Sequence, residues 1–298
     1  MYLQSDAGDY IGGGVNRLYT AANAALSDSA SGALFHISVN GDTWWDGDFQ
    51  AMSSATTLVP GYYAGLGRYP FNNPVTGGLS WSGDGRGCNT LTGWFVVDEV
   101  SYVNGTLASI KLRFEQHCEG GAAALHGAIN WTATDSTTPP GPVMPPPANL
   151  WSPDSASLPA SGRYVYLQSD AGDYIGAGQT YLYTDSNINL SGSSNGGLFA
   201  ISATNSSHWW YGDFLAMNSL SKLQPGYYGS LERYPFNNPV TGGLSWYGDG
   251  RGCNTLTGWF VVDDVTYVNG SLTSIKLRFE QHCEGGTAAL HGQIYWTP

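Results

Sequence analysis

In the stretch 110–118, four ionisable residues alternate with mainly apolar ones. Alternate residues of a β-strand point to opposite faces of a sheet, so the pattern predicts a strand with one polar and one core-facing side. The polar side is either a solvated row of paired charges or a surface that binds a ligand. It would consist of Lys111, Arg113, Glu115 and His117, and the core side of Ile110, Leu112, Phe114, Gln116 and Cys118.

The same stretch returns about 165 residues later, because the sequence contains two copies of one segment. Residues 2–12, for example, recur unchanged at 166–176. A repeat of this length is a duplicated domain rather than a solenoid unit. We therefore predict domains at 1–132 and 164–298, joined at 133–163 by a semi-rigid linker rich in Pro, Ser and Thr. The linker contains a tryptophan that could dock on a domain.

Neither copy shows helical periodicity, and strand-like runs recur roughly every 8–12 residues. The Asn104-Gly105 pair between two of these runs predicts a tight hairpin. The expected fold class is all-β, as two tandem antiparallel β-sandwich domains of jelly-roll-like type, with a barrel as the alternative. The strands expected in the first copy are 2–4, 9–11, 34–39, 44–52, 61–66, 79–81, 93–102, 109–118 and 124–131.

Each copy has two cysteines that are 30 residues apart, Cys88 with Cys118 and Cys253 with Cys283. Since each copy had to fold alone, we predict one disulfide within each copy and an oxidising compartment. A Cys/His metal site of Cys88, Cys118, His117 and His126 is the alternative, although its spacing matches no common metal motif. A catalytic pair of Cys118 and His117 is disfavoured because adjacent strand residues face opposite ways.

Several turn-rich polar segments are unchanged between the copies, while residues 21–33 have diverged. Loops normally diverge fastest, so this retention indicates special turn geometry or a ligand. Of the adjacent Trp44 and Trp45, one ring should be in the core, and the other should be exposed as a rim residue or a stacking platform for a sugar. Asp48 and Asp84 follow glycines, in turns where aspartate often bonds its own backbone.

The segment around Cys88 carries Arg86 and Asn89, which could present rigid donors to hydroxyl or carboxylate groups, or brace the loop. His126 is expected beside the polar row. We predict no bound metal or cofactor. The Ca²⁺ candidates are Asp6, Asp9, Asp170 and Asp173, for which a plain turn is the other interpretation. The candidate ligand-binding residues are Trp44, Trp45, Asp48, Asp84, Arg86, Asn89, Arg113, Glu115, His117 and His126, with Trp209, Trp210, Asp213, Asp249, Arg251, Asn254, Arg278, Glu280, His282 and His291 in the second copy.

The composition of the sequence excludes several classes of partner. The net charge of −12 argues against binding to nucleic acid or to anionic membranes. The sequence has no run of 18 apolar residues, so it predicts no membrane-spanning helix. Only 11% of residues are charged, whereas 19 tyrosines and 11 tryptophans indicate a neutral, aromatic surface. No common enzyme motif is present, and glycoside hydrolysis would need two carboxylates facing across a cleft.

The segments 8–12, 114–121 and 124–127, which read GDYIG, FEQHCEGG and ALHG, together resemble a signature of secreted bacterial β-sandwich modules. The resemblance covers both copies and implies an extracellular setting, beside carbohydrate-active or adhesion domains. We therefore expect a non-enzymatic, bivalent carbohydrate-binding protein that is secreted and recognises a glycan. An adhesion or structural module with a protein partner is the alternative, and a glycoside hydrolase is the third hypothesis.

Overall fold

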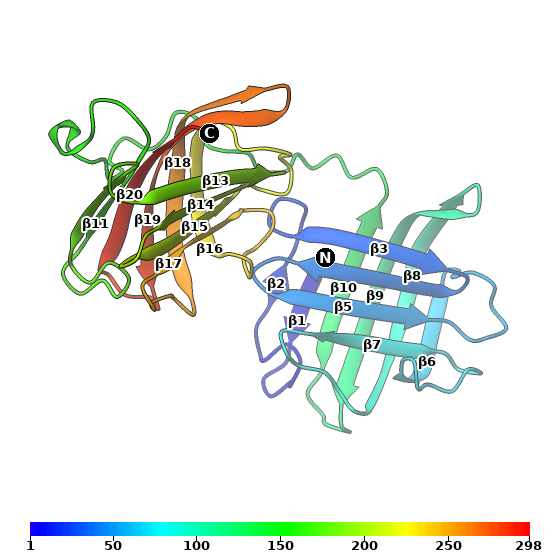
Figure 1. Ribbon diagram of the computed structural model, residues 1–298. Helices are drawn as coiled ribbons and strands as arrows, with labels where there is room; N and C mark the ends of the chain where they lie inside the picture. The colour runs from blue at the N-terminus through cyan, green and yellow to red at the C-terminus, as the bar shows by residue number, and fades with distance from the viewer. The chain divides into compact units, whose positions relative to one another are not determined.

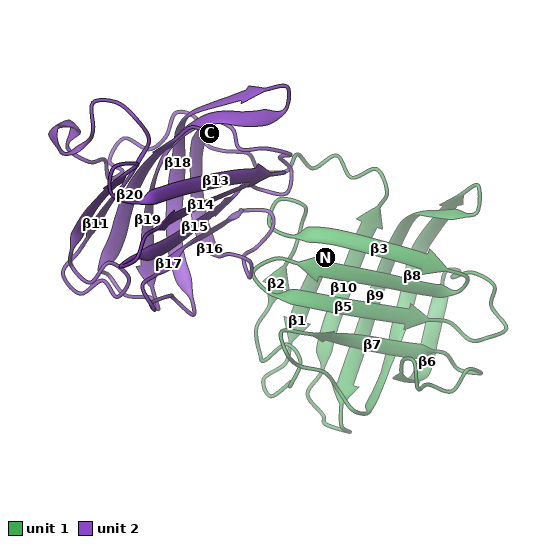
Figure 2. Cartoon of the chain, in the orientation of Figure 1, with its two compact units in different colours: residues 1–138 green, residues 139–298 purple.

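The computed structural model describes residues 1–298, which form two compact units, Met1–Thr138 and Pro139–Pro298 (Figure 2). Each unit is built on one ten-stranded sheet, so the predicted all-β fold in tandem copies is confirmed. The only helical element is η1, a 3₁₀ turn at Ser155–Ser157. No helix of the chain is therefore long and apolar enough to span a membrane.

The sheet of unit 1 follows the order β2-β1-β10-β9-β8-β6-β7-β5-β4-β3. All neighbours are antiparallel except β6 and β7, whose short parallel pairing joins the two halves. Figure 1 shows β3, β5 and β7 crossing over β9 and β10 at a steep angle, as two layers of a sandwich. The strands are β1 Tyr2–Ser5, β2 Arg17–Leu18, β3 Ala25–Ser31, β4 Leu34–Asn40, β5 Trp44–Gln50, β6 Gly61–Arg68, β7 Gly78–Gly83, β8 Leu91–Val103, β9 Thr106–Cys118 and β10 Leu125–Thr132.

Unit 2 repeats this order as β12-β11-β20-β19-β18-β16-β17-β15-β14-β13. The same sequence pattern thus produces the same sheet twice. Its strands are β11 Tyr164–Ser169, β12 Thr180–Thr184, β13 Asn189–Asn195, β14 Leu198–Thr204, β15 Trp209–Leu215, β16 Gly226–Arg233, β17 Gly243–Gly248, β18 Leu256–Val268, β19 Ser271–Cys283 and β20 Ala289–Trp296.

The hairpin between β8 and β9 forms where Asn104-Gly105 predicts it, because both residues adopt the positive φ angles that a tight β-turn requires (51° and 80°). The strand predicted at 9–11 is wrong. Asp9 is buried and its carboxylate accepts the backbone N–H groups of Ile11 and Gly12, which closes a turn. Strand β3 was not predicted because its polar, exposed sequence lacks an alternating apolar face.

Aromatic rings fill the core between the two layers. In unit 1 the Trp81 ring stacks on Phe114, with 5.1 Å between centroids, and Phe49 packs against both Phe95 and Phe114. Gly127 lies against Phe114 so closely that a Cβ atom there would sit 2.0 Å from the ring. The alternation of β9 is as predicted, since Ile110, Leu112, Phe114 and Gln116 are buried.

Both disulfides lie within a copy, Cys88–Cys118 and Cys253–Cys283, and no cysteine is free. The intra-copy prediction is confirmed, and the alternative Cys/His metal site is wrong because its thiols are oxidised. In each unit the disulfide attaches the loop after β7 or β17 to the end of β9 or β19. It therefore anchors the loop that leads into β8 or β18 at the end of the neighbouring strand.

Residues 139–163, which we call the strap, belong to unit 2. Val143 exchanges backbone hydrogen bonds with Tyr227 of β16, and Ser219 donates a side-chain hydrogen bond to the carbonyl of Pro140. Trp151 packs against the outer face of β11 and β20. The proline-rich segment thus lies along unit 2 rather than free in solution.

Candidate functional site

The polar row of β9 forms a hydrogen-bonded cluster around Glu115. One carboxylate oxygen lies 3.1 Å from both the Trp94 indole nitrogen and His117 Nε2, and the other lies 3.3 Å from His126 Nδ1. His126 belongs to β10, directly opposite Glu115 in the register, and its Nε2 lies 3.5 Å from Asp6. The structure therefore brings together three predicted site residues and adds Trp94, which the sequence did not single out.

The equivalent cluster in unit 2 surrounds Glu280 and is more enclosed. His291, His282 and the Trp259 indole contact the carboxylate at 3.1–3.2 Å. The close contact with His291 is the largest cause that lowers the pKa of Glu280 to about 2, against the opposing effect of burial. Glu280 is thus an ionised acceptor at physiological pH, which is unlike the general acid of a hydrolase, whose pKa is raised.

We expect Glu280→Gln to destabilise unit 2 by about 1–2 kcal/mol at pH 7, after allowance for solvent screening. A carboxyl group with a lowered native pKa stabilises the fold above its unfolded value near 4.5, and this contribution is lost as the pH falls toward 2. Thermal unfolding of the wild-type chain and of Glu280→Gln at pH 7, 4 and 2 should therefore show a stability difference between them that becomes smaller as the pH falls. A difference that is independent of pH would contradict the assignment, and Glu115→Gln is the matched variant for unit 1.

Arg113 stands apart from this cluster. It is half exposed and forms a two-pronged ion pair with Asp98, with both distances at 2.8 Å. In unit 2 Arg278 contacts Asp263 at 3.2 Å and also donates to the backbone carbonyl of Trp151 at 2.7 Å. Only the second copy uses this arginine to hold the strap.

A second group of predicted residues meets where β5 begins and β7 ends. Trp45 is buried and Trp44 is 50% exposed, so the predicted division between the two rings is confirmed. Arg86 lies over the Trp45 ring at 5.9 Å and pairs with Asp84 at 2.6 Å. Asp84 lies in a turn, as predicted, with a positive φ of 52°. In this group Asp84 and Arg86 therefore form an ion pair with each other.

Unit 2 differs at this position because His208 precedes the tryptophan pair. His208 Nδ1 lies 2.7 Å from Asp249, whose other oxygen accepts the backbone N–H of Trp209. Arg251 is 4.0 Å from the same carboxylate and lies over the buried Trp210 ring at 5.5 Å. Trp209 remains 47% exposed, as Trp44 does in unit 1.

Asn89 and Asn254 participate through their backbones. The N–H of Asn89 donates to Glu119 at 2.6 Å, and its carbonyl accepts from Arg68 at 3.3 Å. The Asn254 carbonyl likewise accepts from Arg233 at 2.9 Å. These contacts brace the disulfide loop.

Asp48 does not lie in a turn, contrary to prediction, but within β5 on the outer face of the sandwich. It faces His36 of β4 in the register, and His36 Nδ1 lies 2.9 Å from its carboxylate. The other ring nitrogen of His36 contacts Ser38, which in turn donates to Asp46. In unit 1 the acceptors of this face are therefore paired internally.

The equivalent carboxylate in unit 2, Asp213, has no hydrogen bond or ion pair. Ala200 replaces the histidine on β14, and Tyr211 and Tyr247 replace Asp46 and Ser82. Burial raises the pKa of Asp213, as expected for a carboxylate that lacks compensating donors. Asp213 is thus the unsatisfied counterpart of a group that unit 1 satisfies.

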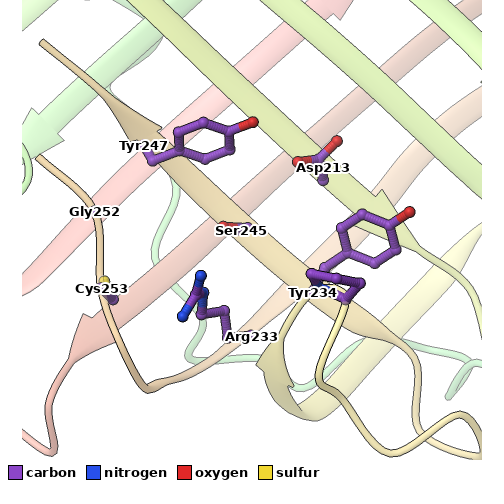
Figure 3. Close-up of a pocket in the computed structure, with 8 residues that line it drawn as sticks. Asp213, Arg233, Tyr234, Ser245, Tyr247, Gly252 and Cys253 are labelled. Atoms are coloured by element: carbon purple, nitrogen blue, oxygen red, sulfur yellow. The ribbon is translucent and has the colours of Figure 1, made fainter. Parts of the chain in front are cut away.

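Asp213 lines a pocket of about 370 Å³ on the outer face of unit 2 (Figure 3). Tyr247 forms one wall and stacks on Tyr211, with 5.4 Å between ring centroids. Arg233 is held by the Asn254 carbonyl and packs over Phe236 at 5.0 Å. The complete lining is Asp213, Arg233, Tyr234, Pro235, Ser245, Tyr247, Gly252 and Cys253.

Only Asp213 of these lining residues is among the predicted ligand-binding residues. Arg233, Tyr234 and Pro235 belong to a segment that both copies retain, so a signal for them was present. Tyr247 could not be found in that way, because the first copy has Ser82 in its place. Identity between the two copies cannot indicate a residue that differs between them.

The weak Ca²⁺ candidates form turn braces. The Asp9 carboxylate accepts from Ser5, Ile11 and Gly12, and Asp173 makes the same three contacts in unit 2. Asp6 accepts the N–H of Ala124, the residue before β10, and thereby ties this turn to the start of that strand. The oxygens of Asp9 and Asp173 are therefore already engaged by protein donors.

Comparisons of the chain with known protein families, with curated protein sequences and with solved structures found no match.

Proposed function

We propose that this chain is a non-enzymatic carbohydrate-binding protein and that the pocket around Asp213 holds a sugar ring. The observation that carries the proposal is the unpaired, half-buried Asp213 carboxylate between tyrosines, where unit 1 has a carboxylate paired with histidine. A carboxylate that has lost water without gaining a protein donor is compensated when a ligand supplies hydroxyl groups.

The other lining groups suit the same ligand. Tyrosine rings stack on the apolar C–H faces of sugars, and the Arg233 guanidinium can donate to ring or hydroxyl oxygens. The volume of about 370 Å³ falls in the usual range for small-ligand pockets. Glycosidases use two carboxyl groups across the bond that they cleave, whereas this pocket has one, which supports recognition over hydrolysis.

The extracellular setting is part of the proposal and is supported by the two disulfides. Duplication supports two binding surfaces on one chain. However, His36 occupies Asp48 in unit 1, so we assign the Asp213-type pocket to unit 2 and expect the two units to differ in ligand preference.

The test is a glycan-array screen of the full chain, followed by titration of the best ligand. We expect Asp213→Asn and Tyr247→Ser to weaken binding at least tenfold, because each removes a direct contact worth about 1.4 kcal/mol or more. Binding should also weaken on acidification, around a midpoint above the ordinary aspartate value, and Asp213→Asn should abolish this pH dependence.

Asp48→Asn is the matched control, because Asp48 holds the same position in unit 1 and is paired with His36. It should leave the affinity of the unit 2 pocket unchanged. A folded chain that binds no glycan would contradict the proposal and favour the adhesion hypothesis. Equal effects of Asp48→Asn and Asp213→Asn would contradict the assignment to this pocket.

A further inference from the structure

Trp151 of the strap packs against the outer face of β11 and β20, and its contacts indicate what kind of ligand this face of the fold can bind. The Trp151 ring stacks on His291, with 5.0 Å between centroids and 19° between planes, and lies nearly parallel to Tyr166 at 6.5 Å. Arg278 donates to the Trp151 backbone carbonyl at 2.7 Å. Unit 2 therefore contacts both the indole ring and the backbone carbonyl of Trp151. Such a face binds a peptide segment through main chain and side chain together.

Unit 1 has the same three residues at the same positions, and nothing covers them. Tyr2, Arg113 and His126 correspond to Tyr166, Arg278 and His291. Tyr2 is 40% exposed against 7% for Tyr166. The side chains of Arg113 and His126 are 56% and 37% exposed, against 15% and 11% for their counterparts.

A hollow of about 370 Å³ adjoins this exposed face of unit 1, and Tyr2, Asp98 and Arg113 are among its lining residues. Two positions differ beside it, since unit 1 has Ala128 and Asn130 where unit 2 has Gln293 and Tyr295. Both changes shorten the side chain, so they leave the face open rather than filling it.

We propose that this face of unit 1 binds a proline-flanked tryptophan segment of a partner polypeptide, in the way that unit 2 holds its own strap. Tyr2 and His126 would stack on the indole, and Arg113 would donate to the backbone carbonyl. In the strap, Trp151 is preceded by Pro145, Pro146 and Pro147 and followed by Pro153. Prolines keep such a segment extended before it binds, which lowers the entropic cost of association.

The test uses a fluorescent peptide with the sequence of residues 145–158, titrated into the full chain and followed by anisotropy. We expect saturable binding at one site that unlabelled peptide competes away. Tyr2→Ala and Arg113→Gln should each weaken it about tenfold or more, and both substitutions lie at exposed positions where unfolding can be checked by circular dichroism. A peptide with alanine in place of its tryptophan should bind the wild-type chain at least as weakly as the original peptide binds these variants.

Absence of saturable binding to the wild-type chain would overturn the proposal. So would binding that neither Tyr2→Ala nor Arg113→Gln weakens, since the peptide would then occupy another surface. If the chain does not bind the peptide but Tyr2→Ala abolishes glycan binding, the ligand of this face is a sugar and the peptide assignment is wrong. Because Asp213 takes no part in this face, its variants should leave peptide binding unchanged, which separates this test from that of the proposed function.

Discussion

Replacing both cysteines of the Cys253–Cys283 disulfide by alanine is expected to lower the free energy of unfolding of unit 2 by roughly 3–4 kcal/mol. The bond closes a loop with a sequence separation of 30 residues, so its loss releases that segment in the unfolded chain. It also frees the loop between β17 and β18 from the end of β19. The melting temperature of unit 2 should fall by on the order of 10 °C.

Scanning calorimetry of the full chain is the appropriate measurement. The same double substitution at Cys88 and Cys118 is the matched control, because it should lower only the transition of unit 1. Comparison of the two variants assigns each transition to its unit. If neither variant lowers a transition, the disulfides do not stabilise the folded units in the way that loop closure requires.

Gln281→Leu is expected to destabilise unit 2 by roughly 2–4 kcal/mol, although leucine has a similar size and suits a core. Gln281 is 1% exposed, and its amide accepts the backbone N–H of Trp246 at 2.7 Å and donates to the Trp246 carbonyl at 2.9 Å. Pairing between β16 and β17 ends at Leu244, so the side chain supplies the bonds that a neighbouring strand would otherwise make. Leucine would leave both backbone groups buried and unsatisfied.

Chemical denaturation of the full chain would measure this loss. Gln116→Leu is the matched variant, since Gln116 makes the same two bonds to Trp81 in unit 1 at 2.8 and 2.9 Å. A cost below about 1 kcal/mol for both variants would show that water or a shifted strand satisfies the backbone instead. The polar residue in the otherwise apolar face of β9 thus bonds β9 to the backbone of β7 across the core.

Features that depend on neighbouring positions were predictable from the sequence. The alternation along 110–118 determined which side of β9 is buried, because the strand period is two. Asn104-Gly105 determined the hairpin, because those residues accept positive φ angles at little cost. Duplication determined the disulfide pairing, since each copy had to fold with its own cysteines.

Features that depend on residues distant in the chain or on adjacent strands were decided by the tertiary structure. Whether Asp48 and Asp213 are paired depends on His36 or Ala200 across the register, and strand pairing is not visible in a single sequence. Trp151 reaches His291 over 140 positions only because the strap lies along unit 2. The sequence thus determined most of the strands, the faces of β9 and the duplication, although it missed β3 and predicted a strand at 9–11 that is a turn. The structure alone decided which polar groups are satisfied, because satisfaction depends on contacts between strands and layers that local pattern does not encode.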